Sequence, residues 1–195
     1  MAAARPFSDS STEAICDPDD KRWCLVHATH MNDSEYRSVA DSGAVVGLCP
    51  ITEADLGDGF FEAEKFLHMD GRMAIGSDSN LRISPCEELR LLEFGMRLRT
   101  GRRNVIARDG LGCGMTLYTT AVSGGRIALG QPVGDIVVGN RADLLELDPE
   151  HPMLEGVSDD DLLERYVFAG EKRMIRSVFV AGREQVRNGI HISRA

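Results

Sequence analysis

The chain lacks any apolar segment long enough to span a membrane, and its first residues lack the apolar centre of a signal peptide. It also lacks a block of basic residues: 22 Lys and Arg stand against 31 Asp and Glu, which gives a formal net charge of −9. Such an acidic chain is poorly suited to bind phosphate backbones or anionic lipid. We therefore expect a cytoplasmic protein with no membrane partner and no nucleic-acid partner.

The chain also lacks a Cys-x-x-Cys pair. Its five cysteines are odd in number, which favours reduced, mostly structural thiols in a cytoplasmic protein. Hydrophobic residues make up 43% of the chain and charged residues 27%, an ordinary balance for a globular protein with a filled core. The cysteines are Cys16, Cys24, Cys49, Cys86 and Cys113.

Beyond a polar stretch at 1–21, the pattern predicts units of a strand followed by a helix. The apolar run Trp23–Val26 predicts a strand buried on both faces. A helix is expected to follow Asn32, with Glu35 as its capping-box partner, and to end at Gly43. The first 21 residues show no periodicity and are interpreted as an irregular lead-in.

Two more units follow the first. Residues 44–49 predict a second buried strand, followed by a loop at 52–59, and residues 73–76 predict a third strand. A helix is expected to begin after Ser84, with Glu87 three residues beyond it in the capping position. Three such units in a row favour a parallel α/β arrangement. The apolar stripe of this last helix is expected to lie in the core: Leu89, Leu92 and Met96.

The number of strands limits the fold. A closed barrel of eight β/α units needs roughly 250 residues. Only three parallel strands are predicted here, and an open sheet of three would leave strand edges exposed. The chain is therefore either a piece of a barrel or an unusual small fold.

The pattern changes after about residue 130. Residues 136–138 and 142–147 predict a hairpin, residues 162–167 a short helix, and residues 178–180 with 184–186 a second hairpin. This stretch is antiparallel in character and is expected to form a small β-rich appendage. We therefore divide the chain into a lead-in (1–21), a partial barrel (22–130) and a C-terminal β-rich segment (131–195).

Polar side chains follow the ends of the predicted parallel strands, where catalytic groups gather in such folds. His27 and His30 follow the first strand, and Asp78 follows the third. Each has a plain alternative: a hydrogen-bonded structural histidine, the start of the next helix, or a turn cap. Taken together, a histidine and a carboxylate at the mouth of one barrel suit a divalent metal and its bound water.

Several longer motifs identify a family. They resemble formimidoylglutamate deiminase, of the amidohydrolase superfamily, over roughly Arg22 to His191. The resemblance implies an α/β fold: the C-terminal part, about three β/α units, of a TIM-type (β/α)8 metal-dependent hydrolase barrel plus a small β-rich appendage. The motifs that carry it are Trp23 to His30, Gly47 to Pro50, Thr52-Glu53-Ala54, Leu56 to Gly59, Ile75 to Ser79, Glu87 to Glu93 and, in the tail, Gly139 to Leu144.

The resemblance implies a reaction and site residues. The family hydrolyses N-formimino-L-glutamate to N-formyl-L-glutamate and ammonia, a step of histidine breakdown. Asp78 matches the aspartate that binds zinc and handles a proton of the attacking water, and His27 matches the histidine that polarises the substrate or steadies the leaving group. Thr52, Glu53 and His30 are implied as substrate-binding residues. Arg82 and Arg90 are candidates for binding the substrate carboxylates because they are near in sequence.

The sequence departs from the family pattern in its metal ligands. No two of its five histidines are spaced as His-x-His, and none before His27 could serve as the fifth-strand ligand. Asp78 alone matches a zinc ligand, whereas a catalytic zinc takes about three protein ligands. Smaller departures are Ile51, Asp55 and Asn80, where Thr, Asn and His are expected.

Three hypotheses follow. In the first, the chain is part of a zinc-dependent deiminase and is inactive alone. In the second, it belongs to another deaminase of the superfamily, of the guanine or adenosine type, although the Thr52-Glu53 pair is against it. In the third, it is a non-catalytic remnant that serves as a binding or oligomerisation partner, and a homo-oligomer is compatible with any of the three.

Overall fold

The computed structural model describes residues 22–194, so the predicted lead-in at 1–21 lies outside the described residues. The first sheet has three short strands in the order β1 (Cys24–Val26), β2 (Val45–Leu48) and β3 (Arg72–Ile75). Both neighbouring pairs are parallel. The prediction of a parallel α/β arrangement is therefore confirmed for these strands.

Helix α2, Asp33–Ser42, begins as its sequence predicts. The side chain of Asn32 accepts hydrogen bonds from the backbone N–H groups of Ser34 at 2.9 Å and Glu35 at 3.1 Å. The Glu35 carboxylate accepts one from the Asn32 N–H at 2.7 Å, which completes a capping box. Gly43 ends the helix in the left-handed conformation, with φ 72°.

The loop predicted at 52–59 is wrong, because most of it is helix α3, Pro50–Leu56. Proline suits a first helical turn, where its missing N–H leaves no hydrogen bond unmade. Gly57, at φ 70°, ends the helix, so the glycine that suggested a loop is a helix C-cap. A second short helix, α4 (Ala63–His68), follows.

Strand β1 is more exposed than predicted. Trp23 is 50% exposed and Val26 57%, whereas Val45 and Val46 in β2 are fully buried. Among residues 22–194, β1 pairs with β2 on one edge only. The prediction of a strand buried on both faces is therefore wrong for β1, because an edge strand lacks the second neighbour and the covering layer that β2 has.

Helix α5, Pro85–Thr100, carries the apolar stripe that the sequence predicts. Leu89, Leu92 and Met96 are at most 4% exposed. Leu89 and Leu92 belong to a core cluster that also receives side chains from α2, α4 and the parallel strands. The prediction that this stripe is core packing is confirmed.

The start of α5 is not capped as predicted. The hydroxyl of Ser84 makes no capping bond and lies 3.3 Å from the Sγ atom of Cys86. Glu87 does not reach back to the backbone, because its carboxylate accepts hydrogen bonds from the guanidinium of Arg82 at 2.7 and 3.0 Å. The helix begins where predicted, but the capping box is absent.

A second sheet follows in the C-terminal part of the described chain. Ala181 and Gly182, at φ 50° and 74°, form the tight turn of a hairpin, which confirms the second predicted hairpin. All neighbouring strands are antiparallel. Their order is β4 (Leu144–Leu147), β5 (Ile175–Val180), β6 (Arg183–Arg187) and β7 (Ile190–His191).

The first predicted hairpin is wrong. Residues 136–138 form no strand, and β4 pairs with β5 instead. The Asn140 N–H donates to the Val137 carbonyl at 3.2 Å, so this stretch closes a turn and cannot run as a strand. The longer β5, rich in β-branched residues, offers β4 a partner over its whole length. The apolar side chains that suggested a strand are exposed, Ile136 by 90%.

Helix α7, Leu162–Ala169, lies where the sequence predicts a short helix. Its Tyr166 and Val167 are buried, and Gly170 follows its last residue.

The predicted division at residues 130 and 131 stays a prediction. Four short 3-10 turns complete the described chain: Pro152–Leu154, Asp159–Asp161, Lys172–Met174 and Ile192–Arg194.

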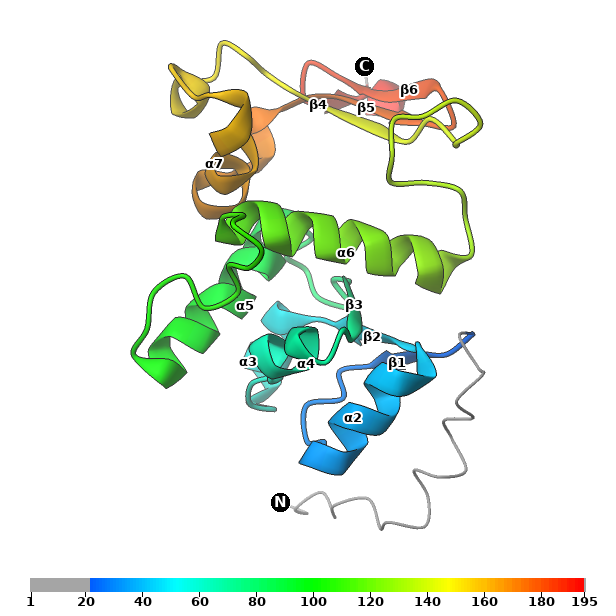
Figure 1. Ribbon diagram of the computed structural model, residues 1–195. Helices are drawn as coiled ribbons and strands as arrows, with labels where there is room; N and C mark the ends of the chain where they lie inside the picture. The colour runs from blue at the N-terminus through cyan, green and yellow to red at the C-terminus, as the bar shows by residue number, and fades with distance from the viewer. Residues whose placement is uncertain (1–21, 195) are drawn as a thin grey trace.

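Helix α6, Cys113–Leu129, follows the parallel sheet in the chain and packs against β3 and α7. Figure 1 shows it running across the middle of the molecule, with the parallel sheet and α2 to α4 on one side and α7 with the antiparallel sheet on the other. No helix within residues 22–194 is long and apolar enough to cross a membrane. The helix lies so close to β3 that a Cβ atom on Gly124 would be 1.9 Å from the Met73 carbonyl oxygen.

This close approach gives a matched pair of substitutions. Gly124→Ala should lower the free energy of unfolding by about 1–3 kcal/mol, because the new methyl group has no room beside β3. Gly125→Ala, where a Cβ would meet nothing within 4 Å, should raise it by about 0.5–1 kcal/mol through helix propensity. Urea unfolding of the three proteins measures both effects, and equal effects of the two substitutions would contradict the close packing.

Candidate active site

The residues that follow β1 and β3 have unusual backbone angles. His27 and Ala28 have φ of 67° and 49°, and Asp78 has φ of 50°. Non-glycine residues seldom adopt this left-handed region, and such strain gathers at functional sites. The His27 N–H still donates to the Gly47 carbonyl at 2.8 Å, so β2 holds the chain as it turns out of β1. The turns therefore aim both side chains at the carboxyl ends of the strands.

Glu53, in the first turns of α3, is the buried centre of this group. Its side chain is 4% exposed, and its Oε1 atom accepts the Cys49 N–H at 2.8 Å. The same oxygen lies 3.2 Å from the Nδ1 atom of His27. Because an ionised carboxylate can only accept hydrogen bonds, this contact favours the His27 tautomer with its proton on Nδ1. The Nε2 atom is then free to act as an acceptor on the opposite side of the ring.

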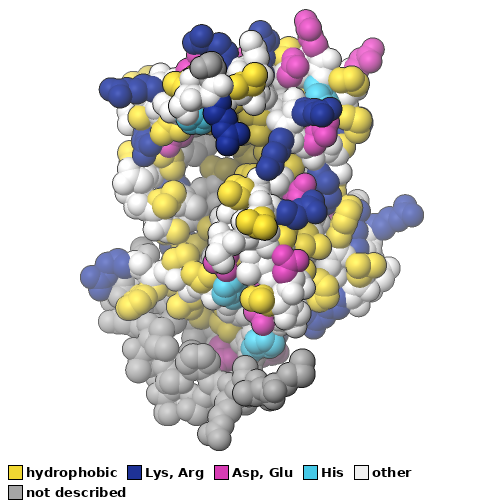
Figure 2. Space-filling model, turned by 180° about the vertical axis from the view of Figure 1, so that it is seen from behind, with side chains coloured by type: hydrophobic (Ala, Val, Ile, Leu, Met, Phe, Trp, Pro, Cys, Tyr) yellow, Lys and Arg dark blue, Asp and Glu magenta, His cyan; other side chains and the backbone are white. Residues whose placement is uncertain are grey.

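That opposite side faces Asp78. The Nε2 atom of His27 lies 3.7 Å from the Oδ2 atom of Asp78, within ion-pair range and beyond hydrogen-bond range. The two side chains are 32% and 38% exposed. In Figure 2, histidine side chains lie beside acidic ones in the lower half of the rear face. The structure therefore brings together His27, Glu53 and Asp78 from three segments, with two of them open to solvent.

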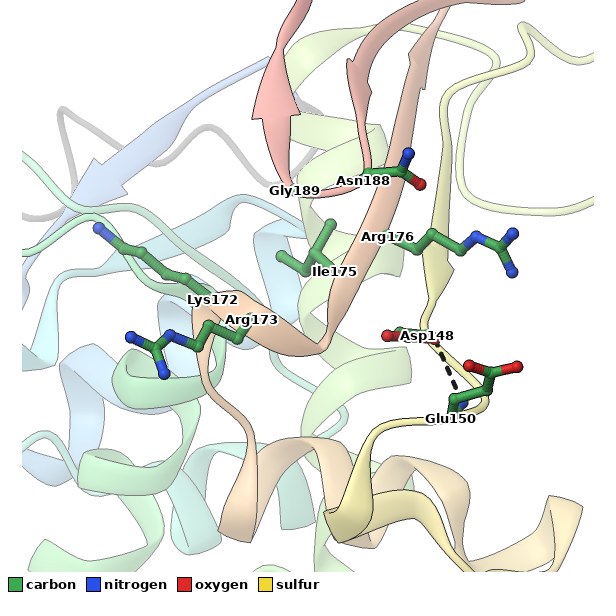
Figure 3. A pocket seen from close by; sticks show the side chains of 8 residues that line it. All are labelled: Asp148, Glu150, Lys172, Arg173, Ile175, Arg176, Asn188 and Gly189. Atoms are coloured by element: carbon green, nitrogen blue, oxygen red, sulfur yellow. Dashed lines mark hydrogen bonds between the residues drawn. The ribbon is translucent and has the colours of Figure 1, made fainter.

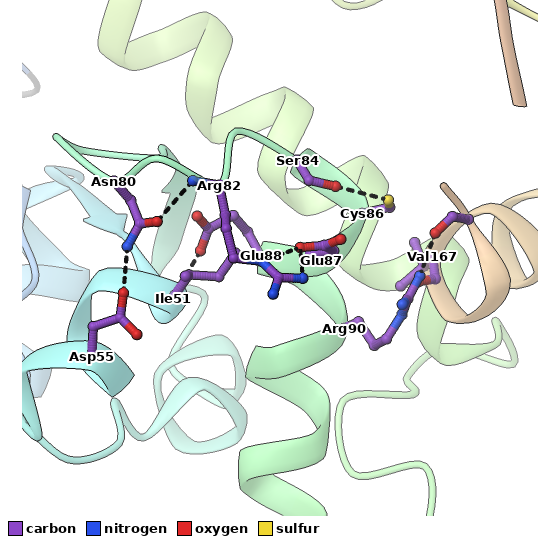
Figure 4. Close-up of polar contacts among 11 residues, drawn as sticks. Ile51, Asp55, Asn80, Arg82, Ser84, Cys86, Glu87, Glu88, Arg90 and Val167 are labelled. Atoms are coloured by element: carbon purple, nitrogen blue, oxygen red, sulfur yellow. Dashed lines mark hydrogen bonds and ion pairs between the residues drawn. The ribbon is translucent and has the colours of Figure 1, made fainter. Parts of the chain in front are cut away.

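The loop after β3 is fastened to α3. The amide of Asn80 donates to the Asp55 carboxylate at 2.7 Å, as Figure 4 shows, and lies 3.5 Å from the Thr52 hydroxyl. That hydroxyl in turn lies 3.4 Å from the Ser77 carbonyl. These contacts hold the Asp78 turn against the helix that carries Thr52. Two departures from the family pattern, Asp55 and Asn80, thus contact each other.

Other residues singled out in the sequence lie apart from this group. His30 is exposed, and the structure gives its ring no hydrogen bond within residues 22–194. Arg90 donates to the carbonyls of Val167 and Gly170 at 2.9 and 2.7 Å, so it fastens α5 to the end of α7. Arg82 is engaged by Glu87, as described above. Within residues 22–194, the structure records no hydrogen bond or ion pair between either guanidinium and Asp78.

Sequence reasoning missed Glu88. Its side chain is among the most buried in the described chain, and its Oε2 atom accepts the Ile51 N–H at 2.9 Å. Burial raises the pKa of Glu88 to about 7, against the lowering effect of the Ile51 bond, and the nearby Glu53, Glu87 and Asp55 raise it further. One signal could have found it: Glu88 stands one helical turn before Leu92, on the buried side of α5.

Cys49, the residue before α3, is held in its unreactive thiol form. Burial raises the pKa of the Cys49 thiol to about 11, and the negative charges of Glu53, Asp78 and Glu88 add to this rise. The thiolate that a nucleophile or a metal ligand needs is therefore strongly disfavoured. Cys49 serves as a packing residue, 5% exposed.

The donor set does not fit a catalytic zinc by itself. Residues 22–194 contain no group of three or more His, Cys, Asp or Glu side chains arranged to hold a metal ion. A catalytic zinc takes about three protein ligands. Within the described chain, His27 and Asp78 could be ligands, but they are too few.

A surface hollow in the C-terminal part of the described chain offers no competing site. It measures about 470 Å³ and lies at the end of the antiparallel sheet. Figure 3 shows its basic side chains pointing apart, with Lys172 and Arg173 on one side and Arg176 on the other. Asp148 and Glu150 add negative charge beside Arg176. The basic groups do not converge on one point, as the recognition of an anion would require.

Comparison with known proteins decides the family. The model of the amidohydrolase family matches residues 4–184. This chain belongs to the amidohydrolase family. It is 54% identical over 173 residues to formimidoylglutamate deiminase of Pseudomonas aeruginosa, a match that covers 88% of this chain and 38% of that protein. The resemblance to formimidoylglutamate deiminase that the sequence motifs carry is therefore confirmed.

Solved structures agree on the fold. An amidohydrolase from Brucella melitensis matches with a TM-score of 0.84 and 43% identity, over 91% of this chain and 39% of that one. An adenosine deaminase from Xanthomonas campestris with bound zinc matches with a TM-score of 0.78 over 89% and 39%, but its 23% identity shows the fold alone. The chain thus spans about two fifths of the length of these relatives, and its architecture is that of part of a TIM-barrel-type hydrolase.

The buried position of Glu53 yields a stability prediction. Glu53→Ala should lower the free energy of unfolding by about 1–3 kcal/mol, because the buried Cys49 N–H loses its acceptor. Glu53→Gln should lose less, since its carbonyl oxygen can still accept that bond. Asp41→Ala, on the exposed surface of α2, should stay within about 0.5 kcal/mol. Chemical denaturation checks the order, and a Glu53→Ala protein as stable as the Asp41→Ala control would contradict it.

Proposed function

We propose that this chain supplies the C-terminal part of the barrel of a formimidoylglutamate deiminase, which hydrolyses N-formimino-L-glutamate to N-formyl-L-glutamate and ammonia. One observation carries the proposal: His27, Glu53 and Asp78 meet at the carboxyl ends of parallel strands. In barrel enzymes of this type, catalytic groups lie at those strand ends. The 54% identity to the Pseudomonas enzyme supports the choice of reaction.

In this proposal Asp78 and His27 are the catalytic residues. The reaction needs a proton taken from the attacking water and a proton given to the departing nitrogen. Asp78, exposed by 38%, is reached by solvent and can carry that proton. His27, with Nδ1 turned to Glu53, presents Nε2 to the same space and can steady the substrate nitrogen.

Substrate binding is proposed for Thr52, Glu53 and His30. Thr52 and Glu53 lie on the first turns of α3, beside the two catalytic residues. His30 is exposed on the segment between β1 and α2, so its ring is accessible to a ligand. The Oε1 atom of Glu53 holds His27 and the Cys49 N–H, so the proposed contact with substrate is assigned to its Oε2 atom.

Zinc enters the proposal through Asp78 alone. The zinc-bound relative supports a divalent metal for the complete enzyme. Since the described donor set is too small, further ligands would have to come from residues beyond 22–194 or from another polypeptide. A homo-oligomer is one arrangement that would supply them.

The small donor set also favours a second candidate function. A chain that binds no metal could act as a non-catalytic partner of another polypeptide, and β1, which has no second strand neighbour within residues 22–194, offers one place for such contact. The two candidates differ in whether this segment can support hydrolysis when the rest of a barrel is present.

A hybrid enzyme tests the reaction. The matching segment of the Pseudomonas deiminase is replaced by that of this chain, and ammonia release from N-formimino-L-glutamate is measured. We expect activity within about tenfold of the parent, and a loss of about 10²–10⁴-fold with Asp78→Asn, the usual range for a proton-transfer group. Asp41→Asn, far from the strand ends, should leave the rate unchanged.

The outcomes separate the hypotheses. A folded hybrid without activity favours the non-catalytic partner. A hybrid that deaminates guanine or adenosine favours the second deaminase class. An active hybrid that tolerates Asp78→Asn contradicts the role given to that residue.

Metal content of the isolated chain gives an independent check. After zinc loading and desalting, elemental analysis of the purified chain should find well below one zinc per chain, because about three ligands are needed. About one tightly held zinc would show that ligands outside residues 22–194, or on a second copy, complete the site.

A further inference from the structure

Helix α3 begins without a cap of its own. Its N-cap residue, Cys49, makes no side-chain capping bond, and Pro50 has no N–H to satisfy. The Ile51 N–H is therefore the first donor in this helix that needs a partner from outside it. An unpaired N–H at a buried helix end would be costly, and Ile51 is 7% exposed.

Glu88 supplies that partner from a different helix. Its carboxylate comes from α5, 37 positions away in sequence, and accepts the Ile51 N–H at 2.9 Å. Figure 4 shows the Glu88 side chain directed at the start of α3. The side chain is buried, with residue exposure of 1%, so solvent does not compete for this bond. Glu88, from α5, therefore caps helix α3, whose own N-cap residue makes no side-chain capping bond.

The two residues after Ile51 are the ones that the proposed site depends on. Thr52 contacts the Ser77 carbonyl beside Asp78, and Glu53 holds His27. We propose that Glu88 is a positioning residue, which fixes the first turn of α3 and thereby sets where Glu53 and His27 stand relative to Asp78. The proposal rests on the proposed function for its catalytic meaning, but the anchoring itself can be tested without activity.

The charges around Glu88 make the anchor sensitive to pH. The groups that face it are acidic: Glu53 and Asp55 on α3 and Glu87 on α5, with the Cys49 thiol close by. Arg82, which lies near Glu87 and Asp55, is engaged by Glu87. The Oε1 atom of Glu88 is buried and has no partner within residues 22–194. These features disfavour the charged form and account for a pKa of about 7.

The raised pKa of Glu88 determines how its contribution to the free energy of unfolding changes with pH. A glutamate of ordinary pKa 4.5 in the unfolded chain ionises before the folded protein does. The contribution of the neutral Glu88 to stability is therefore full below about pH 4.5 and declines as the pH rises to about 7. The Ile51 bond gains an ionised acceptor over the last part of this range, which strengthens the bond itself. As the pH rises toward 7, the Ile51–Glu88 hydrogen bond therefore becomes stronger, while the contribution of Glu88 to the free energy of unfolding falls.

Nuclear magnetic resonance of the full chain tests the proposal. In the wild type, the Ile51 amide resonance should titrate with a midpoint near pH 7, together with the carboxyl carbon of Glu88. Glu88→Gln, which keeps an acceptor and removes the charge, should abolish this titration. Glu87→Gln, on the same helix and bonded to Arg82, is the matched control and should leave a titration of Ile51 in place.

Hydrogen exchange supplies the second readout. Glu88→Leu should lower the protection of the Ile51 amide on the order of tenfold, the loss expected for one hydrogen bond. The Gly76 amide, which donates to the Leu48 carbonyl at 2.9 Å in the sheet, should change much less. A uniform fall of protection at both amides would mean that Glu88 only stabilises the fold and would overturn the positioning role.

The result is independent of the reaction. An Ile51 amide that does not titrate in the wild type, with unchanged protection in Glu88→Leu, would overturn the anchor even if the hybrid enzyme is active. A confirmed anchor in a chain whose hybrid is inactive would overturn the proposed function alone. If Glu88→Leu fails to fold, the comparison of wild type with Glu88→Gln still decides the question.

Discussion

One buried carboxylate, that of Glu53, organises the strand ends. It accepts the backbone N–H of Cys49, where β2 turns into α3, and it contacts the imidazole of His27, where β1 turns toward α2. A single oxygen therefore joins two neighbouring strand ends. The contact between Glu53 and His27 also fixes which nitrogen of the imidazole is turned to Asp78, because Nδ1 faces Glu53 and Nε2 lies on the other side of the ring. Because Glu53 lies on α3, every residue that positions this helix also positions the histidine, and the contacts of Glu88 and Asn80 gain their importance from this dependence.

The parallel sheet is the other constraint on the molecule. Parallel sheets are normally covered on both faces and continued on both sides, as β2 is here. Strand β1 instead leaves Val26 57% exposed, and within residues 22–194 this strand has β2 as its one neighbour in the sheet. The matches to relatives of the amidohydrolase family cover about two fifths of their own length, and in a closed eight-stranded barrel every strand has two neighbours. Barrel sites draw their ligands from several strands, whereas residues 22–194 hold three parallel strands and no group of three or more metal-binding side chains.

Local chemistry made some elements predictable and left others hidden. The start of α2 and the turn from β5 to β6 follow from residues within a few positions of each other, and both predictions are confirmed. Residues 136–138 show why such patterns fail: their apolar run resembles a strand, but the partner of β4 is decided by β5, far along the chain. The approach of His27 to Asp78 follows from the rule for strand ends. Glu88 was missed because its partner, Ile51, lies on a different helix.

The charges of the site bear on which end of the substrate it would receive. Glu53, Asp55, Asp78 and Glu88 lie near one another around Cys49 and the first turn of α3, and Arg82 and Arg90 are engaged elsewhere. Such a group repels carboxylates and attracts cations. Under the proposed function the substrate carries an amidine, a strong base with a positive charge at neutral pH, so its formimino end would suit this edge of the sheet. We infer that the two carboxylates of the substrate would be held by residues outside this group. If the proposed function holds, this chain would then receive the reacting end of the substrate, and other strands of the barrel would receive its anionic end.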